Sequence, residues 1–279
     1  MARYDDIFVT PGWLSANLHK ENVVVIDCRY DLGNPARAIE MYKAGHIPRS
    51  FRLDMERDLA GPRSVHGGRH PLPDFEVLSS KLRRFGISSD SIIICYDDDL
   101  SGSSRLWFLM NCMGHSHTKI LDGGIAGWVE EGHMLSTAPA VPERDGTFHP
   151  AFGEFLSRIS EMEEIRRNLD SMQIIDSRAR PRYLGEYEPI DYRGGHIPGA
   201  INIEYTRIQE KPGKIRKQDE LEAIYSGIGR EPVVYCGSGV TSCVNFVGLI
   251  MTGRSPRLYA GSWSDWISYR SNPVASGDE

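Results

Sequence analysis

Residues 23–29 read Val-Val-Val-Ile-Asp-Cys-Arg, and residues 172–178 read Met-Gln-Ile-Ile-Asp-Ser-Arg. In each segment a short, mainly apolar run ends in an aspartate that is followed two positions later by an arginine. A second pair of segments, Ala-Gly-His-Ile-Pro at 44–48 and Gly-Gly-His-Ile-Pro at 194–198, has the same spacing of about 150 residues. Repetition at a fixed spacing is the sequence signature of a duplicated domain.

Two further pairs of segments occur in the same order in both halves of the chain. Ser-Ile-Ile-Ile-Cys-Tyr at 91–96 matches Glu-Pro-Val-Val-Tyr at 231–235, and Leu-Asp-Gly-Gly-Ile-Ala-Gly-Trp at 121–128 matches Leu-Tyr-Ala-Gly-Ser-Trp-Ser-Asp-Trp at 258–266. Four ordered matches predict two similar domains. We expect the first domain at residues 5–135, a proline-containing linker at 136–150, and the second domain at 151–279.

Short apolar strand candidates alternate with helix candidates within each half. The expected strands lie near residues 23–27, 91–96, 118–121, 173–176, 232–235 and 256–259. The expected helices lie near residues 11–20, 74–85, 102–113, 125–131, 160–168, 219–226, 242–252 and 262–268. This alternation predicts an α/β fold in which each half forms a mainly parallel sheet flanked by helices on both faces. Ligands of such pairs tend to bind in the cleft between the domains, at the carboxyl ends of strands.

The composition argues against several classes of protein. The chain has 279 residues, of which 40% are hydrophobic and 25% charged, as in ordinary globular proteins. A formal net charge of −6 gives no support for nucleic acid or a membrane as partner. The amino terminus lacks the pattern of a secretion signal, and no apolar stretch is long enough to span a bilayer. Five cysteines without a Cys-x-x-Cys pair argue against disulfides and thiolate metal sites. We therefore expect a reduced, cytoplasmic protein with no metal and no cofactor.

The run Val-Val-Tyr-Cys-Gly-Ser-Gly-Val-Thr-Ser at 233–242 carries the strongest functional signal. It places Cys236 between an apolar strand and a stretch of helical length, where free N–H groups and the helix dipole stabilise an anion. Such surroundings lower the pKa of a cysteine, and the thiolate is the nucleophilic form. The loop has no charged side chain, so we expect the backbone to stabilise the thiolate, with Gly237 and Gly239 allowing close approach of a ligand. The alternative is a buried structural cysteine.

Two comparisons restrict the reactions that we expect of Cys236. A cysteine-dependent phosphatase needs an arginine six positions after the cysteine to hold phosphate, and Ser242 stands there instead. In the first half, Asp97 takes the position of Cys236 and begins a run of three aspartates that would repel a bound anion. We therefore expect one active site per chain, in the second half, and a catalytically inactive first half.

The repeated Asp-x-Arg and Gly-His-Ile-Pro segments, the loop at 236–241 and the closing segment at 259–266 together resemble the two-domain rhodanese-like sulfurtransferases. This is the family of thiosulfate and 3-mercaptopyruvate sulfurtransferases, and the resemblance covers roughly residues 5 to 275. It implies tandem rhodanese-like domains and a Cys236 persulfide that takes a sulfane sulfur from thiosulfate or 3-mercaptopyruvate. The acceptor would be cyanide, a thiol or a protein such as a thioredoxin-like protein.

The loop offers several donors to such a persulfide. We expect the sulfur to be held by the N–H groups of residues 237–242, namely Gly237, Ser238, Gly239, Val240, Thr241 and Ser242. The hydroxyl groups of Thr241 and Ser242 are further donors, and helix capping is the alternative role for both and the favoured one for Ser242.

The preferred donor stays open between thiosulfate and 3-mercaptopyruvate. Thiosulfate-preferring loops of the family often carry cations, so the neutral loop resembles the mercaptopyruvate type. By resemblance, Arg182 matches a carboxylate-binding arginine of that type, and a solvated surface charge is the alternative. A second arginine of that type has no clean match, because Ile190 stands near the expected place. Arg193 is the substitute that the sequence offers.

The mercaptopyruvate subgroup is also thought to use a serine, a histidine and an aspartate to handle the donor. By resemblance these are Ser238, His70 and Asp54, since a histidine can move a proton near neutral pH and a carboxylate can orient it. The alternative is that Asp54 and His70 only order a loop between the domains. Cys243 is expected to pack in its helix, with a redox partnership to Cys236 as the alternative. For the whole chain, the alternative is a non-catalytic binding or redox-sensing protein.

Overall fold

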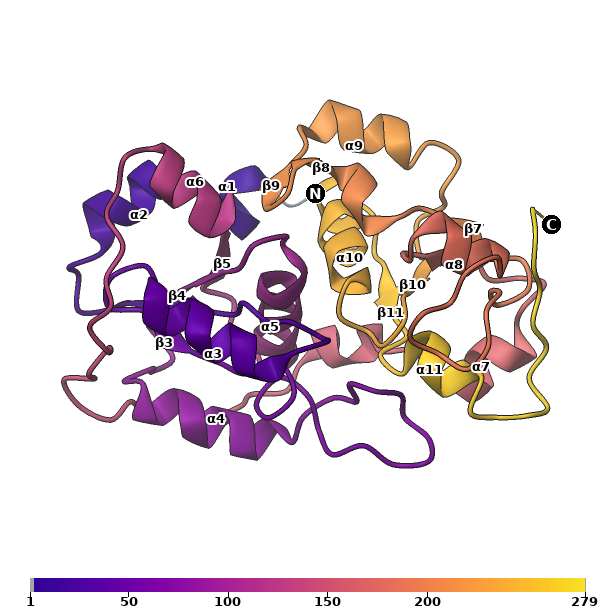
Figure 1. The fold of residues 1–279 in the computed structure, drawn as a ribbon, viewed down its shortest axis with the longest axis horizontal. Helices are drawn as coiled ribbons and strands as arrows, with labels where there is room; N and C mark the ends of the chain where they lie inside the picture. The colour runs from indigo at the N-terminus through magenta and orange to yellow at the C-terminus, as the bar shows by residue number, and fades with distance from the viewer. Residues whose placement is uncertain (1–2, 279) are drawn as a thin grey trace.

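The computed structural model describes residues 3–278, which form two α/β halves side by side (Figure 1). The sheet of the first half has the strand order β1-β5-β4-β2-β3, and all its pairs are parallel. Its strands are β1 (Phe8–Val9), β2 (Val23–Asp27), β3 (Phe51–Arg52), β4 (Ile92–Tyr96) and β5 (Thr118–Leu121). Its helices are α1 (Tyr4–Ile7), α2 (Pro11–Asn17), α3 (Pro35–Ala44), α4 (Phe75–Arg84), α5 (Ser101–Cys112) and α6 (Gly124–Glu130).

The second half has a parallel sheet of order β11-β10-β6-β7 and a separate antiparallel hairpin, β8-β9. The strands are β6 (Ile174–Asp176), β7 (Ile201–Asn202), β8 (Gln209–Lys211), β9 (Lys214–Ile215), β10 (Val233–Tyr235) and β11 (Arg257–Leu258). The helices are η1 (Glu154–Arg158), α7 (Met162–Arg167), α8 (Arg180–Leu184), η2 (Tyr205–Ile208), α9 (Gln218–Ile224), α10 (Ser242–Met251) and α11 (Ser262–Trp266). No helix among residues 3–278 is long and apolar enough to cross a membrane.

Helices cover both faces of each sheet because successive strand residues point to opposite sides. In β2, Val24 and Ile26 pack with residues of α4 and α5, whereas Val23 and Val25 pack with residues of α2 and α6. The second sheet repeats the pattern at β10, with α9 and α10 on one face and α7 and α11 on the other. The predicted fold class is therefore confirmed.

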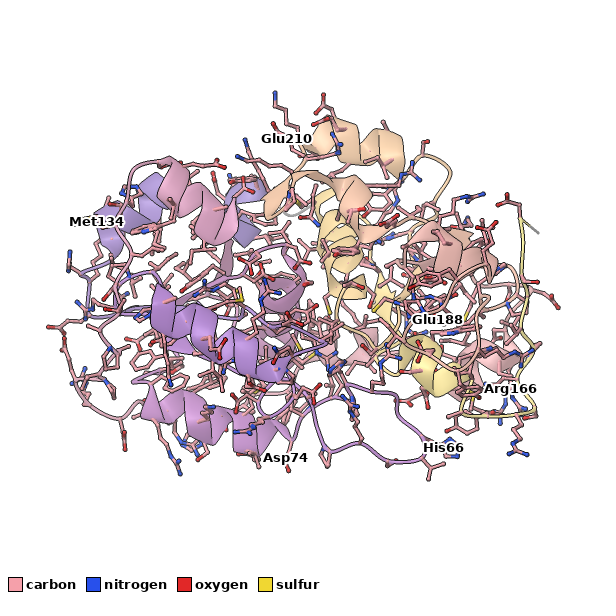
Figure 2. The ribbon with its side chains drawn as sticks, in the orientation of Figure 1. His66, Asp74, Met134, Arg166, Glu188 and Glu210 are labelled. Carbon is pink, nitrogen blue, oxygen red and sulfur yellow. The ribbon has the colours of Figure 1, made fainter. Side chains whose placement is uncertain are left out.

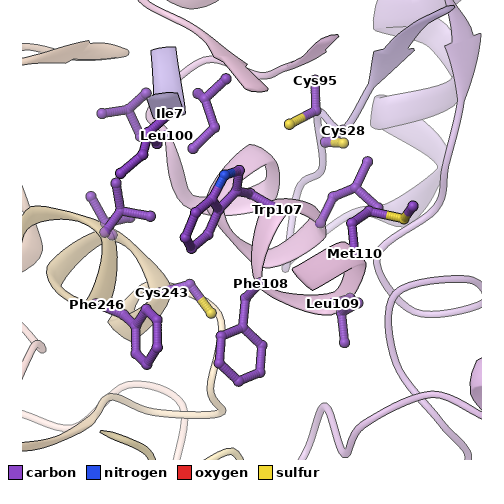
Figure 3. Close-up of a cluster of buried hydrophobic side chains, with 14 of the residues drawn as sticks. Ile7, Cys28, Cys95, Leu100, Trp107, Phe108, Leu109, Met110, Cys243 and Phe246 are labelled. Carbon is purple, nitrogen blue, oxygen red and sulfur yellow. The ribbon is translucent and has the colours of Figure 1, made fainter. Parts of the chain in front are cut away.

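Helices α5 and α10 join the two halves through one continuous core. Phe108 of α5 meets Phe246 of α10 edge to face, with ring centroids 5.0 Å apart. Trp107 and Cys243 belong to the same buried cluster (Figure 3). The two helices follow β4 and β10, the strands that the sequence repeat pairs with each other, so the halves meet along equivalent elements. Residues of the first half can therefore reach the Cys236 loop.

The elements that the sequence did not predict are short or weakly amphipathic. Helix α3 has one buried residue, Ala38, and so presents no apolar stripe. Strands β1, β3 and β7 are two residues long, which is too short for an alternating pattern to be recognised. Helix α8 and the β8-β9 hairpin were also missed, and α8 proves to carry Arg182.

The repeated Asp-x-Arg segments make the same contacts in both halves. Asp27 is fully buried and pairs with Arg29 at 2.5 Å, and Asp176 is fully buried and pairs with Arg178 at 2.6 Å. Because the pair occurs also in the half without a nucleophile, its role is to close the end of the central strand.

Candidate active site

Cys236 lies between β10 and α10, at the carboxyl edge of the second sheet. Only 2% of the residue is exposed. The Gly239 N–H group donates to Sγ of Cys236 at 3.1 Å. On the other side, Ser262 Oγ accepts a hydrogen bond from the Cys236 N–H group at 3.1 Å and lies 4.0 Å from Sγ. The loop thus curls around the sulfur. The Val240 side chain is buried in the shared core, so only its backbone is available to the loop.

The surroundings lower the pKa of Cys236, although burial by itself would raise it. The lowering comes from the hydroxyl groups of Ser242 and Thr241 and from the N–H groups of Ser238 and Ser242. Both the N–H groups of the loop and the hydroxyl groups that the sequence offered as further donors therefore contribute. A lowered pKa increases the fraction of thiolate, which is the nucleophilic form of cysteine.

The favoured capping role of Ser242 is wrong. Thr241 occupies the N-cap position of α10, with no capping hydrogen bond from its side chain, and Ser242 is the first helical residue. The buried Ser242 hydroxyl makes no direct hydrogen bond among the described residues. The N–H group that donates to Sγ of Cys236 is that of Gly239, at 3.1 Å.

Gly239 and Gly237 are required for different reasons. Gly239 has a φ of 78°, and a Cβ atom there would lie 2.1 Å from the carbonyl oxygen of Ala260. Gly237 leaves room for two guanidinium groups, since a Cβ atom there would lie 2.8 Å from Nη2 of Arg69 and 3.3 Å from Nη2 of Arg182. Gly239 thus shapes the loop around the sulfur, and Gly237 leaves the loop open to cationic side chains.

We expect Gly239→Ala to destabilise the protein by more than about 2 kcal/mol, because a left-handed backbone strain is added to a clash with Ala260. Gly199→Ala is the matched control, since Gly199 has a φ of 75° and nothing within 4 Å of an added Cβ atom. Its expected cost is about 1 kcal/mol. Urea unfolding measures both variants, and equal losses of stability would show that the clash is relieved without cost.

A long loop of the first half, residues 56–73, crosses to the second half and is anchored on α11 (Figures 1 and 2). The His66 ring stacks on Tyr269 with ring centroids 3.9 Å apart. The Gly67 N–H group donates to Asp265 at 2.6 Å. These contacts bring the end of the loop, with Arg69 and His70, to the mouth of the Cys236 site.

His70 and Ser238 are brought together as the resemblance implied. Nδ1 of His70 lies 2.8 Å from Ser238 Oγ, and His70 is almost fully buried. Burial, followed by the positive charges of Arg105 and Arg69, lowers the pKa of His70 to about 3. The imidazole is therefore neutral at pH 7, and its Nδ1 can accept a hydrogen bond from the Ser238 hydroxyl.

The carboxylate that His70 faces belongs to Glu56, not to Asp54. Oε1 of Glu56 lies 3.7 Å from Nε2 of His70. Asp54 pairs with Arg52 at 2.9 Å and accepts hydrogen bonds from the N–H groups of Glu56 and Arg57. In the described structure no hydrogen bond or ion pair joins Asp54 to His70. Asp54 thus shapes the turn that presents Glu56, a residue whose position no sequence signal marked.

The buried His70 makes stability dependent on pH. Its pKa in the folded protein, about 3, lies below the ordinary value of 6.5, so the unfolded chain binds the proton more tightly. The stabilisation is complete above pH 6.5 and is lost as the pH falls from there toward 3. We expect His70→Gln to lose less stability than the wild type between pH 7 and pH 5 in thermal melts. Parallel losses in the two proteins would contradict a neutral, buried His70.

Two arginines and two carboxylates form a cluster over Gly237. Arg182 pairs with Glu188 at 2.9 Å and with Asp191 at 3.0 Å, and Arg69 pairs with the same Asp191. Arg69 comes from the first half, and no sequence signal pointed to this position. Figure 2 marks Glu188 in the second half.

Arg193 does not join this cluster. It is exposed, and its guanidinium group makes no hydrogen bond or ion pair among the described residues. Its carbonyl oxygen accepts a hydrogen bond from Trp263 Nε1 at 2.8 Å, which ties its backbone to α11. The second guanidinium beside the loop is therefore that of Arg69, and Arg193 is not the substitute.

The chain resembles known sulfurtransferases along nearly its whole length. The model of the rhodanese-like domain matches residues 10–131 and 161–269. A protein of Pseudomonas aeruginosa named "probable 3-mercaptopyruvate sulfurtransferase" is 37% identical over 97% of this chain and 98% of its own length. The chain belongs to the tandem rhodanese-like sulfurtransferases.

The thiosulfate sulfurtransferase of Mus musculus is 29% identical over 93% of this chain and 91% of its own length. The crystal structure of SseA from Escherichia coli, described as a 3-mercaptopyruvate sulfotransferase with the rhodanese fold, matches with a TM-score of 0.80. SseA is 30% identical to this chain, and the match covers 92% of this chain and 98% of the SseA chain.

In this sulfurtransferase the first-half loop holds a carboxyl group in place of a thiol. The Asp97 carboxyl oxygens accept hydrogen bonds from the N–H groups of Leu100, Gly102 and Ser103 at 2.9, 2.6 and 3.1 Å. Burial and the neighbouring Asp99 raise the pKa of Asp97 to about 8. This raised pKa agrees with the expectation that the three aspartates disfavour negative charge here, and Asp97 itself fills the place that sulfur has in the second half.

A cavity of about 490 Å³ separates the two loops of the sulfurtransferase. Asp98 and Asp99 line it from the first half, and Arg182 and Thr241 line it from the second. This agrees with the expected location of ligands between the domains, at the carboxyl ends of the strands.

Proposed function

We propose that this sulfurtransferase works through a persulfide on Cys236. The observation that carries the proposal is one loop in which a buried thiol receives the Gly239 N–H group and has its pKa lowered. In the first step the thiolate attacks the sulfane sulfur of the donor, so that an S–S bond forms and the donor's bond to that sulfur breaks. The leaving group takes the electron pair. In the second step the acceptor attacks the outer sulfur, and Cys236 leaves as a thiolate.

3-Mercaptopyruvate is the donor that the surrounding residues fit best. Its carboxylate can be held by Arg182 and Arg69, whose guanidinium groups both reach the space above Gly237. Cleavage of its carbon–sulfur bond leaves the enolate of pyruvate, which needs a proton. The mercapto group of the donor supplies this proton, and Ser238 and the neutral His70, hydrogen-bonded at 2.8 Å, can relay it to the enolate.

Thiosulfate is the second candidate donor, since relatives of both names match the chain. As a dianion it gains most from a site with net positive charge. Here Glu188 and Asp191 balance the charges of Arg182 and Arg69. This balance favours the monocarboxylate over the dianion.

The acceptor proposed is a small thiol, cyanide or a thioredoxin-like protein in the cytoplasm. The five free cysteines suit such a reducing compartment. A redox-sensing role through Cys243 is disfavoured, because burial raises the pKa of Cys243 to about 12 and so suppresses its thiolate.

Intact-mass measurement after incubation with each donor tests the proposal. We expect one added sulfur atom, located on the peptide that contains Cys236 and removed by cyanide or a thiol. A protein that takes up no sulfur from either donor would contradict the proposal and favour the non-catalytic alternative.

A further inference from the structure

Arg105 is a fully buried cation at the boundary between the two halves. It lies on α5 of the first half, and its side chain forms no ion pair with a carboxylate in the described part of the chain. Its guanidinium donates instead to backbone carbonyl groups. These belong to Gly239 at 3.0 Å, His70 at 3.1 Å, Pro71 at 3.3 Å and Leu59 at 3.4 Å.

A buried guanidinium without a counter-ion is costly, so its position requires a compensating interaction. Burial lowers the pKa of Arg105, while the thiol groups of Cys243 and Cys236 act in the opposite direction when ionised. The geometry places this positive charge close to the Cys236 sulfur, because Arg105 donates to the carbonyl oxygen of Gly239 and the N–H group of the same residue donates to Sγ of Cys236. A buried positive charge close to a thiol favours the thiolate.

The partners of Arg105 are parts of the active site. Gly239 gives its carbonyl oxygen to Arg105 and its N–H group to Sγ of Cys236. His70 gives its carbonyl oxygen to Arg105 and its ring nitrogen to Ser238. One guanidinium thus connects the loop that holds the sulfur with the loop that carries the histidine.

We propose that Arg105, in the half that lacks a nucleophile, is a positioning residue that orients the Cys236 loop and keeps its sulfur ionised. The first half would then have a function besides packing, because it supplies the buried positive charge that the Cys236 loop of the second half lacks. The inference rests on the proposed function only for its effect on turnover, because the ionisation of the thiol can be measured without any sulfur donor.

Alkylation of Cys236 by iodoacetamide across a range of pH tests the inference. Other titratable and polar groups around the thiol remain unchanged in the variants. They are the hydroxyl groups of Thr241, Ser242 and Ser262, the Ser238–His70 pair, Cys243, and the cluster of Arg69, Arg182, Asp191 and Glu188. We expect Arg105→Met to raise the alkylation midpoint by about one to two pH units. Turnover at neutral pH falls by about tenfold or more with the thiolate population. Arg105→Lys keeps the charge, so its midpoint should stay closer to that of the wild type, while turnover falls because lysine cannot hold four carbonyl groups.

Arg254→Met is the matched control. Arg254 also donates to carbonyl groups, those of Ile228 at 3.0 Å and Tyr225 at 2.8 Å, but it follows the far end of α10. We expect it to lose stability without a shift of the alkylation midpoint. A folded Arg105→Met protein with the wild-type midpoint would overturn the inference. If Arg105→Met does not fold, Arg105→Lys is the test. An Arg105→Lys protein with both the turnover and the alkylation midpoint of the wild type would overturn the inference. Absence of turnover in the wild type would contradict the proposed function and leave the titration as an independent result.

Discussion

Cys236→Ser is expected to abolish sulfur transfer, with turnover at least about a thousandfold below the wild type for both donors. A serine hydroxyl has the shape of the thiol but is not ionised by the Gly239 N–H group and the loop hydroxyls, and it cannot form a persulfide. Steady-state turnover and the intact mass after exposure to 3-mercaptopyruvate and thiosulfate measure the effect. The variant should show no added sulfur atom.

Cys243→Ala is the control for this substitution. Cys243 lies in the first turn of α10, after the Cys236 loop. Its Sγ atom donates to the Gly239 carbonyl at 3.4 Å, but burial keeps its thiol protonated. We expect this variant to take up one sulfur atom as the wild type does. Sulfur uptake that survives in Cys236→Ser and disappears in Cys243→Ala would reassign the nucleophile.

Arg182→Ala is expected to raise KM for 3-mercaptopyruvate by about 10- to 100-fold, since a charge-assisted, two-point contact to the donor carboxylate is lost. The side chain of Arg182 reaches the space above Gly237, where its Nη2 atom would lie 3.3 Å from an added Cβ atom. We expect Arg69→Ala to act in the same direction. Turnover with thiosulfate, which has no carboxylate, should change by less than about threefold.

Two arginines serve as controls for charge and for position. Arg180 lies on the same helix as Arg182 but is exposed and pairs with Asp278. Arg193 is exposed, and its guanidinium has no partner among the described residues. Neither alanine variant should alter KM for 3-mercaptopyruvate. An equal loss with both donors in Arg182→Ala would indicate damage to the fold or a contact shared by the donors, and an effect of Arg193→Ala would restore the role first expected for it.

The fold and the backbone loop around Cys236 could be predicted because their signals are local. A few neighbouring residues are enough to indicate the backbone conformation in the apolar runs at 23–27 and 233–235, in the repeated motifs and at the glycines around Cys236. Helix α3 escaped despite its ten residues, because one buried residue makes no periodic pattern. The match of Ser238 with His70 came from resemblance to a family and not from any spacing in the chain.

The sequence by itself determined a duplicated parallel α/β fold and a single loop, in the second half, that can hold an ionised cysteine. Only the tertiary structure decided which charges surround that loop. Arg105 and Gly239 are 134 residues apart along the chain, and the packing of α5 on α10 brings them into contact. Arg69 and Glu56 reach the site because residues 56–73 are anchored on α11. Electrostatic interactions depend on distance in space and on burial, and neither quantity is encoded by the spacing of residues in the sequence.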